Sequence, residues 1–472
     1  MMIPDTEFDG RLVLPADADW DDARVGRVFN GRRPDRQPDA VLIAATVDDV
    51  CRGVLLAKER GWTVAVRSGG HAWAAWSVRD GGLLIDLGAL RSIGYDESNE
   101  IVAAGPATKG GDELSPFLEE RGRFFNGGHC PSVGIGGFLL QGGQGWNQRG
   151  WGWAAESVIA VDVVTADGEL VRADADQNSD LYWAARGAGP TFPGIVVQFH
   201  IKTRPAVGFL GHTVQAYELE DFTEVMTWLY AAHHTISPDV EIVAVSTPVP
   251  LPDGSERRVF LVTGVALVDD ADAAQAALAP FNECPVIDRA IFVQDCAPST
   301  LAEQRAQQER QNPENAQYIT DNAWIDGENT PEGVAAMVEG IRPLFTENPT
   351  DKGFAIWMSN APMRRDLPDM AFSLQTEAYV AAYTVYDDPD DYARNRAWID
   401  RVFAHAQPVT AGQYLGDSDM TSRQLRFMAP ENWERLQEVI AARDPQARFH
   451  RHLAKDEDRL NVNHWQIEEV TA

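Results

Sequence analysis

Two glycine-dense turns, each carrying a nucleophilic side chain, constrain this chain of 472 residues more than any other feature. The first turn, Ser68-Gly69-Gly70, follows an apolar stretch at 63–67 that we predict to be a strand, and it leads into His71. The second turn spans residues 127–145, where glycines flank Cys130 on both sides. Because glycine has no Cβ, such turns let backbone N–H groups converge on an anion. The two turns therefore predict a site for a phosphate-bearing ligand.

An imidazole at one such turn and a thiol at the other indicate attachment to a cofactor, since both groups are nucleophiles. In this pairing the chain resembles the berberine-bridge-enzyme-like branch of the vanillyl-alcohol-oxidase flavoproteins, whose FAD-binding domain is of the PCMH type. The resemblance covers most of the chain. It implies FAD joined at its 8α-methyl group to His71 and at its C6 atom to Cys130.

The same resemblance places further cofactor contacts in the first half of the chain and near its end. Two segments depart from the family pattern: Glu156 and Ser157 replace the usual Asp-Asn, and Pro193 interrupts a segment that otherwise ends Phe-Gly-Ile/Val-Val. The implied contacts are Arg67, Ser68, Gly69, Gly70, Ser77, Val133, Gly134, Gly136, Gly137, Gly142, Gly143, Gly152, Glu156, Val158, Gly194, Ile195, Asn461 and Asn463.

A dinucleotide site of the Rossmann type is the alternative for a glycine-rich chain. Residues 150–155 do satisfy the G-x-G-x-x-A pattern. The preceding residues 147–149, Asn-Gln-Arg, do not read as a strand, although that motif requires one. The sequence therefore disfavours NAD.

Two segments offer a catalytic base. The family often supplies one from a Tyr-x-Asn-Tyr stretch, and the matching stretch here keeps Tyr414 but has Gly416 and Asp417 in place of Asn-Tyr. Tyr414 and Asp417 are both candidates. In a strand predicted at 378–387, Tyr379 and Tyr383 fall on one face because side chains alternate along a strand. Such a pair is either catalytic or part of the aromatic core.

Charge and composition exclude several classes of partner. The net charge of −31 disfavours nucleic acid and anionic membrane surfaces. No apolar run approaches the roughly 20 residues needed to span a bilayer, and the N-terminus shows no secretory leader, so we expect a cytoplasmic protein. The four cysteines have no metal-binding spacing, and we predict no metal site. The sequence leaves the oligomeric state open.

The residue pattern changes near position 208, which predicts two domains of an α+β protein. Short strands and helices alternate over 1–207, the expected PCMH-type FAD-binding domain, where Thr46 is the expected N-cap of a helix at 48–59. Longer strands and helices over 208–424 predict an inserted substrate domain built on an antiparallel sheet. Residues 425–472 are expected to return to the FAD domain, as they do in the resembling family.

These features predict an FAD-dependent oxidase of a small organic substrate, of sugar, alkaloid or polyketide type. A hydride would pass from the substrate to the flavin, and O2 would be the electron acceptor. One alternative is a dehydrogenase of the same fold that passes its electrons to a quinone or a protein. Another is a noncatalytic protein that binds and retains flavin.

Overall fold

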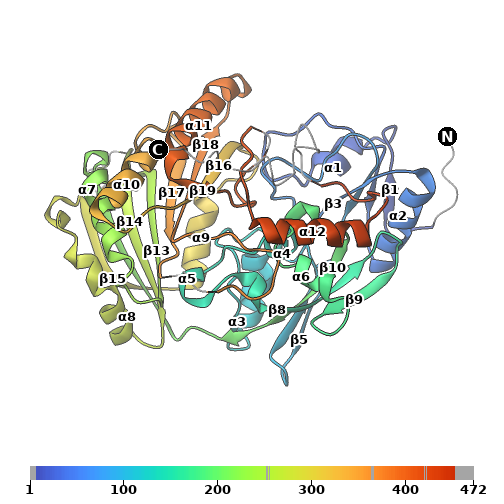
Figure 1. The fold of residues 1–472 in the computed structure, drawn as a ribbon, viewed down its shortest axis with the longest axis horizontal. Coiled ribbons are helices and arrows are strands. Elements are labelled where there is room, and N and C mark those ends of the chain that lie inside the picture. Colours follow the sequence, from blue (N-terminus) through green and yellow to red (C-terminus); the bar gives the residue numbers. More distant parts are fainter. Residues whose placement is uncertain are drawn as a thin grey trace.

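The computed structural model describes residues 7–250, 254, 256–362, 366–418, 420 and 422–451. Two bodies lie side by side in Figure 1, each built around its own β-sheets. No helix in the described residues combines the length and the hydropathy that crossing a membrane requires.

The first body comes from the N-terminal part of the chain. Within the described residues one sheet has the order β1 (Arg11–Val13), β2 (Ala40–Ile43), β4 (Leu83–Asp86) and β3 (Val64–Arg67), with β2, β4 and β3 parallel. An antiparallel sheet has the order β5 (Ile93–Asp96), β6 (Ile101–Ala104), β10 (Ile195–Lys202), β8 (Val158–Val164) and β9 (Leu170–Asp174). Strands β7 (Arg123–Phe124) and β11 (Arg204–Pro205) form a small third pair. The helices are α1 (Trp20–Val25), α2 (Val47–Arg60), α3 (Ser115–Glu119), α4 (Ile135–Leu140), α5 (Gln148–Trp151) and α6 (Ser179–Ala184).

The second body is organised by one antiparallel sheet of eight described strands, called the large sheet below. Its order is β15 (Phe292–Ser299), β12 (Phe209–Tyr217), β14 (Glu256–Val268), β13 (Val240–Pro250), β17 (Phe354–Ser359), β18 (Ala378–Tyr386), β16 (Gln317–Ile325) and β19 (Thr410–Gly412). The helices between these strands are α7 (Phe222–Ala232), α8 (Ala271–Leu278), α9 (Leu301–Gln311), α10 (Pro331–Thr346) and α11 (Tyr392–Ala406). The α+β class with an antiparallel sheet domain is thus confirmed.

Local signals account for several of these elements. Helix α2 begins where Thr46 accepts a hydrogen bond from the Asp49 backbone N–H while the Asp49 side chain returns one to Thr46, a capping box. The segment from residue 110 begins as a wide π-helical turn, Gly110–Leu114, and only then continues as α3. Helix α4 begins inside the second glycine-rich turn, where the sequence indicated no helix.

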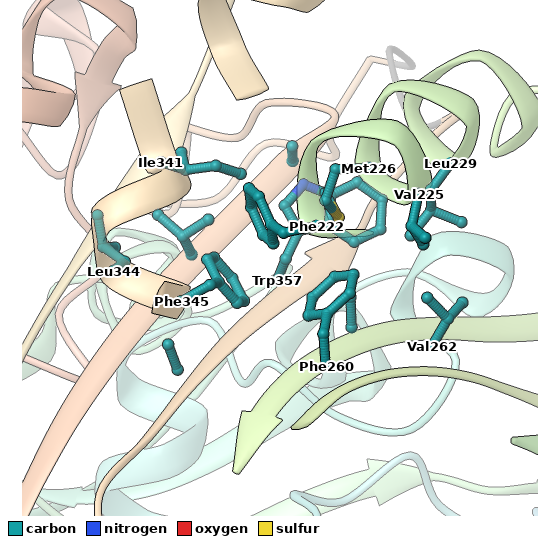
Figure 2. Close-up of a cluster of buried hydrophobic side chains, with 14 of the residues drawn as sticks. Phe222, Val225, Met226, Leu229, Phe260, Val262, Ile341, Leu344, Phe345 and Trp357 are labelled. Atoms are coloured by element: carbon teal, nitrogen blue, oxygen red, sulfur yellow. The ribbon is translucent and has the colours of Figure 1, made fainter. Parts of the chain in front are cut away.

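The outer face of the large sheet is covered by α7, α10 and α11. Figure 2 shows Phe222 and Met226 of α7 packed with Phe345 of α10 over Phe260 and Trp357 of the sheet. Each of these side chains is fully buried or nearly so. Burying one large apolar side chain contributes about 1.5–3 kcal/mol, so this cluster fixes the sheet against its helices. It leaves the opposite, inner face of the sheet free to form a site.

Strand β18 shows how one sequence serves both faces of the sheet. Val380 and Ala382 belong to the outer hydrophobic core, whereas Tyr379, Ala381 and Tyr383 belong to a separate inner cluster. The predicted alternation of 378–387 is therefore confirmed, and the two tyrosines do share the inner face.

Arg149 joins the two bodies. Its guanidinium, in α5 of the first body and 4 % exposed, donates five hydrogen bonds of 2.6–3.1 Å to backbone carbonyls of the second body. Those carbonyls belong to His233, Ile236, Ser237, Val240 and Ala361. Burial lowers the pKa of Arg149 to about 10, while the nearby Asp239 charge acts in the opposite direction and the five carbonyl dipoles hold the guanidinium.

The chain returns to the first body after the large sheet. Helix α12 (Pro430–Arg443) lies across that body in Figure 1 and contributes Trp433 to the core that contains Trp183. Arg443 forms a 2.7 Å ion pair with Asp180. A β-bridge then joins Phe449 to Val64, so this last described segment lies beside the start of β3.

Candidate functional site

The two glycine-dense turns are in direct backbone contact. A Cβ on Gly69 would stand 2.6 Å from the nitrogen of Gly134. Gly70 has a φ of +82°, and a Cβ on it would stand 1.9 Å from the carbonyl oxygen of Arg27. Any side chain would overlap backbone atoms at either position, so both must be glycine. This close approach brings the two predicted nucleophiles onto one wall.

His71 and Cys130 share one hydrogen-bonding partner, Ser132. The Ser132 Oγ lies 3.1 Å from Nε2 of His71 and 3.7 Å from Sγ of Cys130. The His71 ring also stacks on Phe29, with ring centroids 4.2 Å apart. The structure thus places together two residues that the sequence paired only by their chemistry.

The ionisation of these two groups follows from their burial. Desolvation, with a smaller contribution from the Lys109 charge, lowers the pKa of His71 to about 4, so its imidazole is neutral at physiological pH. Burial raises the pKa of the Cys130 thiol, and the Asp112 and Asp417 carboxylates act in the same direction. Cys130 is therefore a thiol that needs a base before it can act as a nucleophile.

A cavity of about 470 Å³ extends from these turns to the inner face of the large sheet. Gly137 lines it, and a Cβ on this residue would meet no atom within 4 Å, so the glycine widens the cavity. Most of the predicted cofactor contacts line the same cavity. They are Arg67, Ser68, Gly69, Gly70, His71, Ser77, Cys130, Val133, Gly134, Gly136, Gly137, Gly194 and Ile195.

Arg67 has a different role from the one its position suggests. Its guanidinium is buried and forms an ion pair with Asp86, with Nε 2.7 Å from the carboxylate, and it also donates to the carbonyls of Ala23 and Arg24. The side chain therefore ties β3 to β4, and its charge is already neutralised. What Arg67 contributes to the site is the position of the turn that follows it.

Five predicted contacts are not part of the described cavity lining, and they stay predictions. Gly142 packs on the Phe372 ring and Gly143 on Phe138. Glu156 turns back within a 3-10 turn to accept a 2.7 Å hydrogen bond from the Trp153 backbone N–H. The structure likewise does not place Gly152 or Val158 on the described wall. The remaining two predicted contacts, Asn461 and Asn463, lie outside the described residues.

The opposite wall holds three of the four candidate catalytic residues: Tyr383, Tyr414 and Asp417. Asp417 accepts hydrogen bonds from Nε1 of Trp73, 3.1 Å from Oδ1, and from the Tyr379 hydroxyl, 2.6 Å from Oδ2. Tyr379 lies behind the wall and fixes the orientation of the carboxylate. It therefore positions another residue and does not itself face the cavity.

The three tyrosines stay protonated at neutral pH. Burial, followed by the Asp417 charge, raises the pKa of Tyr379 and of Tyr383 far above the ordinary value. Burial likewise raises the pKa of Tyr414, whose oxygen accepts a 3.2 Å hydrogen bond from the Gln144 backbone N–H. Phenols of this kind donate hydrogen bonds but are poor proton acceptors, so among the candidate catalytic residues Asp417 is the one that carries a carboxylate.

The cavity lining also contains a pair of ionisable side chains, His129 and Glu241, that the sequence did not predict. His129 Nε2 lies 2.9 and 3.0 Å from the two carboxylate oxygens of Glu241, which also accepts a 2.8 Å hydrogen bond from the Asn147 backbone N–H. Burial opposes the charge on His129, but the carboxylate of Glu241, with Asp417, raises its pKa above the ordinary value. The pair spans the two bodies. The only sequence signal was the adjacency of His129 to Cys130.

The rest of the sheet wall is mostly apolar and faces an amide-rich helix. Alternate residues of β13, Val243 and Val245, line the cavity together with Ile356 of β17. Helix α9 covers them with glutamine side chains and is held to the first body by Arg305, whose Nη1 lies 2.6 Å from Glu119. A substrate here would meet an apolar surface on one side and amide groups on the other.

Outside the cavity, His233, His234 and Glu377 present ligand atoms within 4.8 Å of one another. Their contacts are those of ordinary polar side chains: His234 pairs with Glu377 at 3.5 Å, and Nδ1 of His233 lies 3.0 Å from Ser359 Oγ.

The residues present fit FAD. Glycines without obstructing Cβ atoms line the cavity, two nucleophiles stand beside them, and the Asp417 carboxylate lines the same cavity. A model of the FAD binding domain matches residues 38–174. FAD-linked oxidoreductase nodO of Hypoxylon pulicicidum is 34% identical over 441 residues, which cover 92% of this chain and 95% of that protein.

Two solved structures share the fold. 6-Hydroxy-D-nicotine oxidase from Arthrobacter nicotinovorans matches with a TM-score of 0.81 at 20% identity, over 95% of this chain and 98% of that one. BBE-like 1 of Physcomitrella patens matches with a TM-score of 0.79 at 19% identity, over 94% and 96% of the two chains. Fold and site together define an FAD-dependent oxidoreductase. The chain belongs to the berberine-bridge-enzyme-like family of FAD-linked oxidases with a PCMH-type FAD-binding domain, as its sequence motifs predicted.

Proposed function

We propose that this oxidoreductase oxidises a small organic substrate by hydride transfer to FAD joined to both His71 and Cys130, with O2 as the electron acceptor. The observation that carries the dual attachment is the shared contact with Ser132 on the wall of the cavity. Two nucleophiles held by one hydroxyl can reach neighbouring atoms of a single ring system.

The hydrogen bond to Ser132 indicates which nitrogen of His71 is joined. Ser132 contacts Nε2, so Nδ1 is the nitrogen left to attack the 8α position. The low pKa of the imidazole favours this reaction because a neutral ring retains a nucleophilic lone pair.

Asp417 is the proposed proton acceptor for the substrate. Bound FAD supplies the hydride acceptor, and the chain supplies the group that takes the accompanying proton. Trp73 and Tyr379 hold the carboxylate in one orientation, which meets the requirement that a base be positioned before its pKa matters. Tyr414 and Tyr383 would bind and orient the substrate as hydrogen-bond donors.

The wall chemistry suits a substrate with an apolar face and polar edges. Sugars, alkaloids and polyketides all satisfy this description, and relatives of the fold are named for 6-hydroxy-D-nicotine, xylooligosaccharides and carbohydrates. Such a range supports a small organic substrate without choosing among these classes.

A dehydrogenase of the same fold is the second candidate. Two variants of Phl p 4 share this fold, and one is described as a glucose oxidase and the other as a glucose dehydrogenase. The fold therefore accommodates both acceptors. Comparing O2 consumption with the reduction of a soluble quinone by the same substrate-reduced enzyme separates the two functions.

Acid precipitation tests the attachment. The protein pellet should stay yellow in the wild type, and the double variant His71→Ala/Cys130→Ala should release its FAD into the supernatant. A colourless wild-type pellet would refute covalent attachment. Anaerobic bleaching of the flavin by a panel of sugars, alkaloids and polyketides then tests oxidation itself. A cytoplasmic location stays a prediction, which fractionation of the producing cells would check.

A further inference from the structure

We propose that Ser132 is a positioning residue that conducts the Cys130 proton to the His71 imidazole, so that the cysteine link to FAD forms after the histidine link and depends on it. This inference rests on the dual attachment proposed above. It assigns a role to a residue that the sequence motif contains but does not explain.

The geometry places a single hydroxyl between the two side chains. Ser132 Oγ is 3.1 Å from Nε2 of His71 and 3.7 Å from Sγ of Cys130, and both separations are within hydrogen-bonding range for their atoms. A hydroxyl both donates and accepts, so it can pass a proton from the thiol to the imidazole. Neither neighbour has to move for the transfer.

The Cys130 thiol needs such a path. Its burial stabilises the neutral form, and the nearby Asp112 and Asp417 carboxylates oppose a second negative charge. Only a thiolate adds to an electron-poor ring, and a thiol with a pKa above 9 is about 1 % ionised or less at pH 7. A local base is therefore required for the reaction to proceed at neutral pH.

His71 can be that base once it is attached. Attack through Nδ1 first gives an imidazolium that carries a proton on Nε2, and once that proton is lost to solvent Nε2 has a lone pair that faces Ser132. The thiol proton passes to Ser132 while the serine proton passes to Nε2, and the sulfur bonds to C6 of the flavin. The electron pair of the new bond enters the ring, and loss of the C6 proton restores aromaticity.

The product of this step is a flavin reduced by two electrons. O2 accepts those electrons together with two protons, one derived from the thiol and one from C6, and leaves as hydrogen peroxide. Atoms and electrons then balance: one thiol, one FAD and one O2 give one thioether-linked FAD and one hydrogen peroxide. Another two-electron acceptor could replace O2 without altering the role of Ser132.

The test compares Ser132→Ala with Ser132→Thr, which retains a hydroxyl. Each holoprotein is purified near pH 7, treated with iodoacetamide and digested, and the masses of the peptides that contain His71 and Cys130 are measured. Wild type and Ser132→Thr should show one FAD bridging both peptides. Ser132→Ala should show FAD on the His71 peptide alone, with Cys130 alkylated, because its link forms about 100-fold more slowly without the base.

Raising the pH separates a proton path from packing. In aerated buffer near pH 9.5, hydroxide can remove the thiol proton directly, so Ser132→Ala should then acquire the second link. His71→Asn supplies a second variant that also lacks the base, and it should form the cysteine link as slowly as Ser132→Ala does at pH 7. The double variant should be no slower than either single variant.

Three results would overturn the proposal: a wild-type rate of cysteine linkage in Ser132→Ala, the same rate in His71→Asn, or no gain of the link in Ser132→Ala at high pH. A wild-type protein whose FAD is bound to neither peptide has another meaning, since it removes the dual attachment itself and Ser132 has no such reaction to serve.

Discussion

Replacing Arg149 by methionine should destabilise the protein more than any surface substitution of the same kind. Methionine keeps most of the side-chain length but donates no hydrogen bond. The variant would leave five buried carbonyl oxygens at the junction of the two bodies without the donor that now satisfies them. Because these oxygens come from the segment that joins α7 to β13, the first residue of β13 and the segment just after β17, the junction would lose five polar contacts at once.

The magnitude follows from this geometry. Each buried acceptor left unpaired costs about 1–3 kcal/mol, but removing a buried guanidinium also recovers part of its own desolvation cost. Hydrogen bonds to charged groups contribute about 1.5–3 kcal/mol each, and because the variant loses several of them we expect a loss of unfolding free energy of about 3–5 kcal/mol. Water that enters the space would bring the value toward the lower end.

Urea denaturation of the FAD-loaded protein, followed by tryptophan fluorescence and circular dichroism, measures the effect. The two probes must agree, since a protein with two bodies can unfold in more than one step. Arg401→Met is the matched control: Arg401 is 57% exposed and pairs with Glu347 at 2.6 Å, so its loss should cost less than about 1 kcal/mol. A change below about 1 kcal/mol in Arg149→Met would refute the assignment of this residue as the junction.

Three further predictions concern the cavity. Asp417→Asn should slow anaerobic flavin reduction by an identified substrate by about 10²–10⁴-fold. Tyr379→Phe should slow this reaction less, because the Asp417 carboxylate remains. Equal rates in Asp417→Asn and wild type would exclude Asp417 as the base. The pKa of His129 is raised in the folded protein, so its charge stabilises the fold fully below pH 6.5, and this contribution is lost as the pH rises through the folded-state pKa. Urea midpoints measured across this pH window should therefore fall with rising pH in the wild type. They should not fall in His129→Gln or Glu241→Gln. Cys130→Ala should keep FAD through the histidine and show a lower flavin reduction potential in a dye-coupled titration, since a ring thioether withdraws electron density; an unchanged potential would contradict that reasoning.

Several elements of both bodies could be predicted because their signals are local. Thr46 and Asp49 lie three residues apart and define the start of α2 without any distant partner. Along β18, side-chain alternation assigned Tyr379 and Tyr383 to one face from the sequence alone. Glycines at 69 and 70 marked a turn, although the sequence could not show that Gly134 is the backbone against which Gly69 packs.

Contacts that a residue pattern does not show decide what several site residues do. Glu156 matches a family position, and its carboxylate accepts a local hydrogen bond from the Trp153 backbone N–H. Arg67 stood at the end of the right strand, yet its charge pairs with Asp86. The partner of His129, Glu241, lies on a strand of the other body, and no pattern in the sequence connects them.

The sequence by itself determined the chemistry of this protein: an imidazole and a thiol in glycine-rich turns, a strongly acidic chain, and strands whose alternate residues can face a ligand. These properties are carried by residue type and by spacing of a few positions, which the chain retains in any conformation. Tertiary structure alone decided which groups meet. It placed Ser132 between His71 and Cys130, put Tyr379 behind Asp417, and set Arg149 across the junction. Those contacts join segments far apart in the chain, and their distances are set by how two sheets and their helices pack together.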